Sequence, residues 1–162
     1  MLIEHTASFG AHQSQDAIGT FAALLIPYRA PAREDASHLA ACLSELSGAQ
    51  AQAATLPEAT LRVARAEIAG LLARQCLVAD PDLLGGTGQA VEFLLALRQA
   101  HPCCRVLLAS HSLRGPDFGT HRLPICDASL ALPAQESELA VALWAVERNN
   151  AKWARAPETA AA

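Results

Sequence analysis

The stretch from residue 76 to residue 86 limits the choice of fold more than any other part of the chain. It begins with the apolar run Cys76-Leu77-Val78-Ala79, the pattern of a strand buried on both faces, and stops at Asp80 and Pro81. Proline has no N–H to donate to a sheet, so the strand ends there. An acid at the end of such a strand either marks a ligand site, as is usual in open α/β sheets, or only caps the following turn.

Short apolar runs alternate with segments of helical periodicity along most of the chain. Strands are expected at 21–26, 50–55, 76–80, 105–110 and 126–132, and helices at 32–46, 57–74, 88–100 and 135–149. This alternation predicts an α/β fold: a doubly wound parallel sheet of five strands with helices on both faces. The stretch 112–124 contains two glycines and two prolines, so a fourth helix there is expected to be short or broken.

Details within these elements are also predicted. Thr55 and Glu58 have the spacing of a capping box before the second helix. That helix is expected to bury Leu61, Ile68, Leu71 and Leu72. Thr87 is expected to cap the third helix.

Length and composition set the domain organisation. The 162 residues fit one domain at 21–150, with an N-terminal extension at 1–20 and a C-terminal tail at 151–162. A net charge of −4 without a basic patch argues against direct nucleic-acid binding. No apolar run is as long as a membrane span, and the N-terminus does not resemble a signal peptide. We therefore expect a cytoplasmic protein that does not bind membranes.

The five cysteines do not form a metal-binding or redox pattern, because none is part of a CxxC pair. Cys42, Cys76 and Cys126 fall in expected helices or strands and are interpreted as small buried hydrophobic residues. No metal and no cofactor are expected.

The order of these motifs resembles the receiver domain of two-component response regulators over residues 21 to about 149. Asp80 ends the third strand where that family has its phosphoacceptor, and Gly85 follows five residues later. Ala109 and Ser110 end the fourth strand, where the family has the Thr or Ser of its switch. Leu132, before Pro133, ends the fifth strand, where the family has a lysine. The resemblance implies a flavodoxin-like sheet with strand order 2-1-3-4-5.

The departures from the family pattern concern phosphorylation. Tyr28 and Arg29 follow the first strand, where active receivers have the acids that hold Mg²⁺, and the only lysine of the chain is Lys152. Phosphoryl transfer depends on such charge neutralisation. The resemblance therefore implies a degenerate pseudo-receiver in which Asp80 is no longer phosphorylated and no residue is catalytic. Either Arg29 pairs with Asp80 in place of the metal, or the N–H groups of its own loop hold Asp80.

A pseudo-receiver is expected to act as a protein–protein interaction module in signal transduction or the regulation of gene expression. Its partner would be a regulator, a kinase, an output domain or a second copy of the chain. The expected contact face contains Arg114, Phe118, Arg122 and Trp144.

The sequence also suggests two other classes of function. The loop Gly85–Gly88 could bind a small anionic ligand or nucleotide at a helix N-terminus. An enzyme using Ser110, His111 and Asp80 is disfavoured, because adjacent residues of a strand point to opposite sides.

Overall fold

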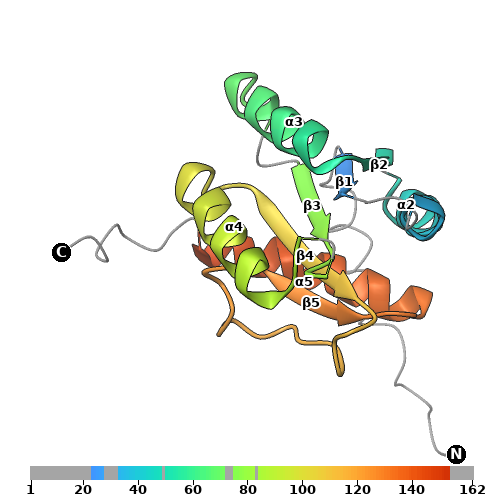
Figure 1. Ribbon diagram of the computed structural model, residues 1–162. Helices are drawn as coiled ribbons and strands as arrows, with labels where there is room; N and C mark the ends of the chain where they lie inside the picture. The colour runs from blue at the N-terminus through green and yellow to red at the C-terminus, as the bar shows by residue number, and fades with distance from the viewer. Residues whose placement is uncertain (1–22, 28–32, 49, 72–74, 83, 154–162) are drawn as a thin grey trace, which may run out of the picture.

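The computed structural model describes residues 23–27, 33–48, 50–71, 75–82 and 84–153 (Figure 1). The five strands in this part of the chain form one parallel sheet in the order β2-β1-β3-β4-β5. They are β1 (Ala23–Pro27), β2 (Gln50–Ala54), β3 (Gln75–Ala79), β4 (Arg105–Ser110) and β5 (Ala128–Ala131). The expected α/β class with a parallel sheet is therefore confirmed.

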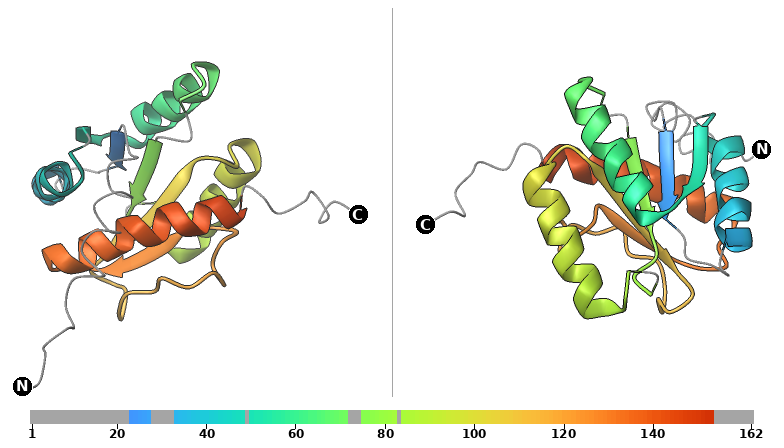
Figure 2. Two further views of the ribbon diagram at one scale, coloured as in Figure 1. Left: turned by 180° about the vertical axis from the view of Figure 1, so that it is seen from behind. Right: turned by 45° about the horizontal axis from the view of Figure 1, so that its top comes forward.

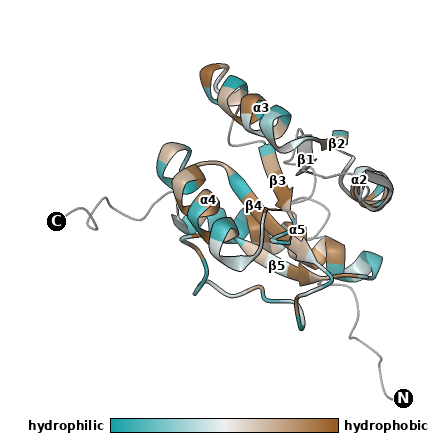
Figure 3. Ribbon diagram, viewed as in Figure 1, coloured by the Kyte–Doolittle hydropathy of each residue, from teal (hydrophilic) through white to brown (hydrophobic). Residues whose placement is uncertain are grey.

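In the described part of the chain, four helices cover the two faces of the sheet (Figures 1 and 2). They are α2 (Arg33–Ser47), α3 (Leu56–Ile68), α4 (Thr87–Ala100) and α5 (Glu136–Trp153). One core contains residues of α2 and α5 against the sheet, and the other contains residues of α3 and α4. The hydropathy colouring in Figure 3 shows the apolar strands β3 and β4 between these layers.

Both ends of α3 follow from local sequence. At its start the N–H of Thr55 donates to Glu58 Oε2 at 2.8 Å, and the Thr55 hydroxyl donates to the same oxygen at 2.8 Å, as the capping-box spacing predicts. The helix ends earlier than expected, because Gly70 adopts a φ of 70°. The Gly70 N–H then donates to the carbonyl of Glu67 and the Leu71 N–H to that of Ala66, which is a Schellman motif.

The buried face of α3 differs from the expected one. Leu61, Ile68 and Leu71 are 50, 89 and 47% exposed. The helix instead buries Ala59, Val63 and Ala66, which are spaced by four and three residues and so lie on one face. Two alanines on this face let the helix approach the sheet closely, and the larger side chains point outward.

The structure differs from the expectations at three other positions. The N-cap of α4 is Gly86, and Thr87 is its first helical residue. Helix α5 continues to Trp153, so this tryptophan is helical and not part of a tail. Cys42 is only half-buried, whereas Cys76 and Cys126 are buried as expected.

The segment between β4 and β5 agrees with the expectation of a short or broken fourth helix. Residues 111–127 contain only turns and an isolated antiparallel bridge between Asp117 and Ser129. The backbone of Asp117 exchanges two hydrogen bonds with Ser129, each 2.8 Å long. This bridge lays the segment along the free edge of β5.

Candidate functional site

Polar side chains from two neighbouring strands meet at the carboxyl edge of the sheet. Asp80 directly follows β3, and its Oδ1 accepts the N–H of Asp82 at 2.9 Å. Ser110, the last residue of β4, is buried and donates its hydroxyl to Asp82 Oδ2 at 3.3 Å. Its Oγ also accepts the N–H of Ser112 at 3.1 Å. Asp80, Asp82, Ser110 and Ser112 therefore form one connected cluster, which we call the edge cluster.

The other sequence-predicted positions lie around this cluster. Ala109 is buried in the core of the sheet, so Ser110 is the residue that reaches the edge. Leu132 directly follows β5, where its N–H donates to the Ser110 carbonyl at 2.9 Å and its side chain is half-buried. Among the described residues, neither Asp80 nor Asp82 forms an ion pair with a lysine or an arginine.

Tyr28, Arg29 and most of the expected terminal segments (residues 1–20 and 154–162) lie outside the described residues. The pairing of Arg29 with Asp80 therefore stays a prediction. The hydrogen bond from Asp82 N–H belongs to the alternative, in which the Asp80 carboxylate is held by its own loop.

Some N–H groups of the glycine loop before α4 already donate hydrogen bonds to nearby carbonyls. Gly85 and Gly86 have φ values of 98° and 93°, a conformation that favours glycine. The Gly86 N–H donates to the Pro81 carbonyl at 3.1 Å, and the Gly85 N–H donates to the Asp82 carbonyl at 3.4 Å. Two of the N–H groups that an anion at this loop would need are thus already engaged.

Side chains of helix α5 hold the segment 111–127 in place through hydrogen bonds to its backbone carbonyls. The side-chain amide of Asn149 is buried and donates to the carbonyls of Phe118 and Gly119 at 3.1 and 3.0 Å, and to that of Asp127 at 2.8 Å. Arg148 Nη2 also donates to the Phe118 carbonyl at 2.9 Å, and its guanidinium lies 4.4 Å above the centre of the Trp144 ring. Phe118 and Trp144, both expected at a contact face, are therefore brought to the same region by Arg148.

The outer side of this segment carries the exposed side chains of two arginines and a histidine. Asp117 accepts contacts from His121 Nε2 at 2.8 Å and Arg122 Nε at 3.2 Å. Arg114 is exposed and forms no ion pair within the described residues. The four predicted face residues thus lie on the segment 111–127 or on the helix that holds it.

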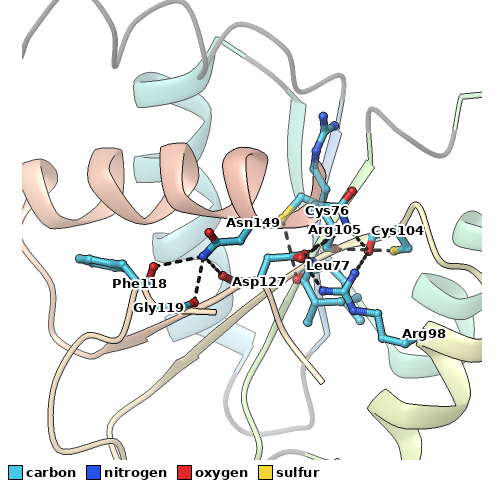
Figure 4. Close-up of polar contacts among 11 residues, drawn as sticks. Cys76, Leu77, Arg98, Cys104, Arg105, Phe118, Gly119, Asp127 and Asn149 are labelled. Atoms are coloured by element: carbon cyan, nitrogen blue, oxygen red, sulfur yellow. Dashed lines mark hydrogen bonds and ion pairs between the residues drawn. The ribbon is translucent and has the colours of Figure 1, made fainter. Parts of the chain in front are cut away.

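A buried polar network that we did not expect lies at the opposite, amino edge of the sheet (Figure 4). Arg98 of α4 is 1% exposed, and its Nη2 lies 2.5 Å from Oδ1 of Asp127, which is 0% exposed. Arg98 Nη1 donates to the Cys104 carbonyl at 2.9 Å. Asp127 Oδ2 accepts the Val106 N–H at 2.7 Å, and Asn150 of α5 donates to both carboxylate oxygens.

This network joins α4, β4, β5 and α5 through one carboxylate. Burial raises the pKa of Asp127, while the charge of Arg98 and the Val106 N–H oppose that rise. Arg98 also lies over the Trp153 ring at 5.6 Å, and Arg105 forms an ion pair with Glu147 nearby. Both oxygens of the Asp127 carboxylate have partners, whereas Arg98 Nε is buried without a hydrogen-bond partner among the described residues. Because the network ties four elements together inside the protein, we interpret it as structural.

The comparisons with known proteins identify no relative: no protein-family model, no curated protein and no solved structure matches this chain. No group of three His, Cys, Asp or Glu side chains in the described part of the chain is placed to hold a metal ion. Among the described helices, none has the length and apolar character needed to cross a membrane.

Proposed function

We propose that this chain is a pseudo-receiver that acts as a protein–protein interaction module without being phosphorylated. The observation that carries the proposal is the chemistry of the carboxyl edge of the sheet. Asp80 directly follows β3 and Ser110 is the last residue of β4, at the positions of the phosphoacceptor and the switch hydroxyl in the family it resembles. Leu132 directly follows β5, where that family has a lysine.

The order of the strands supports the same proposal. A parallel sheet in the order β2-β1-β3-β4-β5 is the flavodoxin-like order, and the turns at 111–127 replace its fourth helix. An acyl phosphate on Asp80 would add negative charge next to Asp82, whose carboxylate is connected to the same cluster. Without a lysine at Leu132, that charge would have no cation from β5.

The segment 111–127 supports a role in binding a protein. It presents Arg114 and Arg122 beside the Arg148–Trp144 pair of α5. Arginine and tryptophan are enriched among the residues that dominate binding energies at interfaces. Asn149 and the bridge to Ser129 hold the segment in one conformation, which lowers the entropic cost of binding.

Phosphorylation tests the first half of the proposal. We expect no modification of the wild-type chain by acetyl phosphate and Mg²⁺, measured by intact-mass spectrometry beside an active receiver domain as positive control. A gain-of-function variant with Tyr28→Asp, Arg29→Asp and Leu132→Lys should acquire Mg²⁺-dependent modification that Asp80→Asn abolishes. Stoichiometric, Mg²⁺-dependent modification of the wild-type chain at Asp80 would overturn the proposal.

Association tests the second half. The tagged chain would be cross-linked in the cells that naturally express it, and its partners quantified by mass spectrometry, with sedimentation equilibrium measuring self-association. Arg114→Glu with Arg122→Glu, or Trp144→Ala, should remove the specific partner. The matched control is Arg62→Glu with Arg65→Glu on the exposed side of α3. If the control removes the partner and the face variants keep it, the assigned face is wrong.

A further inference from the structure

A small cavity opens beside the edge cluster, between α2, α5 and the ends of β4 and β5. Its volume is about 190 Å³. It is lined by His38, Leu39 and Cys42 of α2, His111 after β4, Leu132, Pro133 and Ala134 after β5, and Leu139 of α5. At the packing density of protein interiors, such a cavity holds on the order of ten non-hydrogen atoms. Because four elements converge at the carboxyl edge of an open parallel sheet, the cavity lies where such folds bind ligands.

The lining combines an apolar wall with a few polar groups. Leu39, Leu132, Pro133, Ala134 and Leu139 form the wall. Ligand sites commonly have this composition, with the polar groups fixing the orientation of the ligand. The polar groups here are two imidazoles and a thiol, and His38 Nε2 lies 3.9 Å from Cys42 Sγ. Leu132, which stands at the position of the lost lysine, thus forms part of a ligand-sized space.

The polar groups of the lining favour an acidic ligand. None of the described lining residues is acidic, and each imidazole has an N–H to donate in either tautomer. The nearest glutamates in sequence are directed elsewhere: Glu138 accepts the Gln135 N–H at 2.9 Å, and Glu136 lines a separate shallow groove. A metal is not favoured, because the described residues hold no group of three ligating side chains in reach of one ion.

We propose that this cavity binds a small monocarboxylate with a short apolar body. The body packs between α2 and the β5–α5 connection, and the carboxylate accepts hydrogen bonds from His38 and His111. The proposal uses none of the four residues assigned to the interaction face, although His111 is the first residue of the segment 111–127 that carries most of that face.

Alkylation of the cysteines provides a test with an internal control. Cys42 is half-buried in the cavity wall, whereas Cys103 is exposed at a distance from the cavity, before β4. The full chain would be treated with iodoacetamide in the presence of hexanoate or benzoate, and each thiol followed by peptide mass spectrometry. For ligands this small we expect a dissociation constant on the order of 1 mM. At saturation, alkylation of Cys42 should slow about tenfold, while that of Cys103 stays unchanged.

Neutral analogues and variants test the role of the imidazoles. Hexan-1-ol and benzyl alcohol should protect Cys42 more weakly than the carboxylates, and His38→Gln with His111→Gln should remove that difference. Both histidines are exposed, so these variants should fold. Ala134→Phe, which fills the cavity, should abolish protection, and Leu95→Phe on the exposed side of α4 should not. Equal protection of Cys42 and Cys103, equal protection by alcohols and carboxylates, or no protection up to the solubility limit would overturn the proposal.

Discussion

Arg98 and Asp127 form an ion pair inside the protein, with Nη2 and Oδ1 2.5 Å apart and both side chains inaccessible to solvent. Arg98 comes from α4 and Asp127 directly precedes β5, so the pair connects two layers of the fold (Figure 4). The carboxylate also accepts the Val106 N–H, and the guanidinium also donates to the Cys104 carbonyl. These added hydrogen bonds replace part of the lost hydration of both charges, although Arg98 Nε has no hydrogen-bond partner in the described part of the chain.

The first prediction concerns the loss of one member of this pair. Asp127→Asn keeps the shape of the side chain but leaves Arg98 buried without a counter-charge, which should lower the free energy of unfolding by about 3–5 kcal/mol. Urea denaturation measures this difference. The control is Asp117→Asn, whose partners Arg122 and His121 are exposed, and which should cost about 0–1 kcal/mol. Equal losses of unfolding free energy in the two variants would show that the buried ion pair stabilises the fold no more than the exposed one does.

The second prediction concerns the amide that holds the segment 111–127. Asn149→Ala removes three hydrogen bonds to the carbonyls of Phe118, Gly119 and Asp127, which should cost about 1–3 kcal/mol. Amide hydrogen exchange should become faster in residues 111–127 and stay unchanged in α3. Arg148→Ala removes one exposed hydrogen bond to the Phe118 carbonyl, one to Asn149 Oδ1 and the contact with the Trp144 ring. It should have a smaller effect, because only the first of these contacts reaches the segment. Unchanged exchange in Asn149→Ala would mean that the bridge to Ser129 holds the segment without this side chain.

The third prediction concerns the pH dependence of stability from the buried thiols. Burial raises the pKa of Cys104 and Cys126 from an ordinary value of 9.0 to about 12. As the pH rises, the unfolded chain loses these protons before the folded chain does. The contribution of the two thiols to the free energy of unfolding is therefore fully present below pH 9.0 and is lost as the pH rises toward about 12. The slope should reach about 1.4 kcal/mol per pH unit for each thiol.

Urea denaturation between pH 8 and pH 11 would measure this slope, with Cys104→Ala and Cys126→Ala together as the control that should lower it to the contribution of Cys76, whose pKa is also raised by burial. At about pH 10 iodoacetamide should modify exposed Cys103 in the folded protein and leave buried Cys104 intact. A slope as steep in the double variant as in the wild type would assign the effect to other groups.

The sheet could be predicted from the sequence because its strands are short apolar runs between clear breakers. The strand 105–110 has the same bounds in the sequence analysis and in the structure. Pro81 and Pro133 mark the ends of two others at the carboxyl edge, and this placed Asp80 and Leu132 correctly at that edge. These signals are local, so neighbouring residues alone carry them.

The polar network could not be predicted, because its members are far apart in sequence. Arg98 looks like an ordinary basic residue in the last turn of a helix, and Asn149 and Asn150 look like polar residues at a helix end. Only the parallel pairing of β4 with β5 brings Asp127 to Arg98 and Asn150. The cavity beside Leu132 was missed for the same reason, since its wall comes from four separate segments.

The fourth prediction follows from the helix whose buried face the periodicity misassigned. Large apolar side chains dominate the periodicity from which the buried face of a helix is predicted. For this reason the sequence pattern predicts Leu61 and Ile68 on the buried face and does not predict Ala59 and Ala66 there. In the structure Val63 is 1% exposed and Ile68 is 89% exposed, although both lie in α3.

Val63→Ala should therefore cost about 2 kcal/mol through lost burial and a small cavity. Ile68→Ala should change stability by less than about 0.5 kcal/mol, because the side chain is already in water. The two variants remove similar apolar groups from the same helix, so urea denaturation of the pair isolates burial from helix propensity. A larger loss of stability in Ile68→Ala than in Val63→Ala would mean that α3 packs on the sheet with the opposite face.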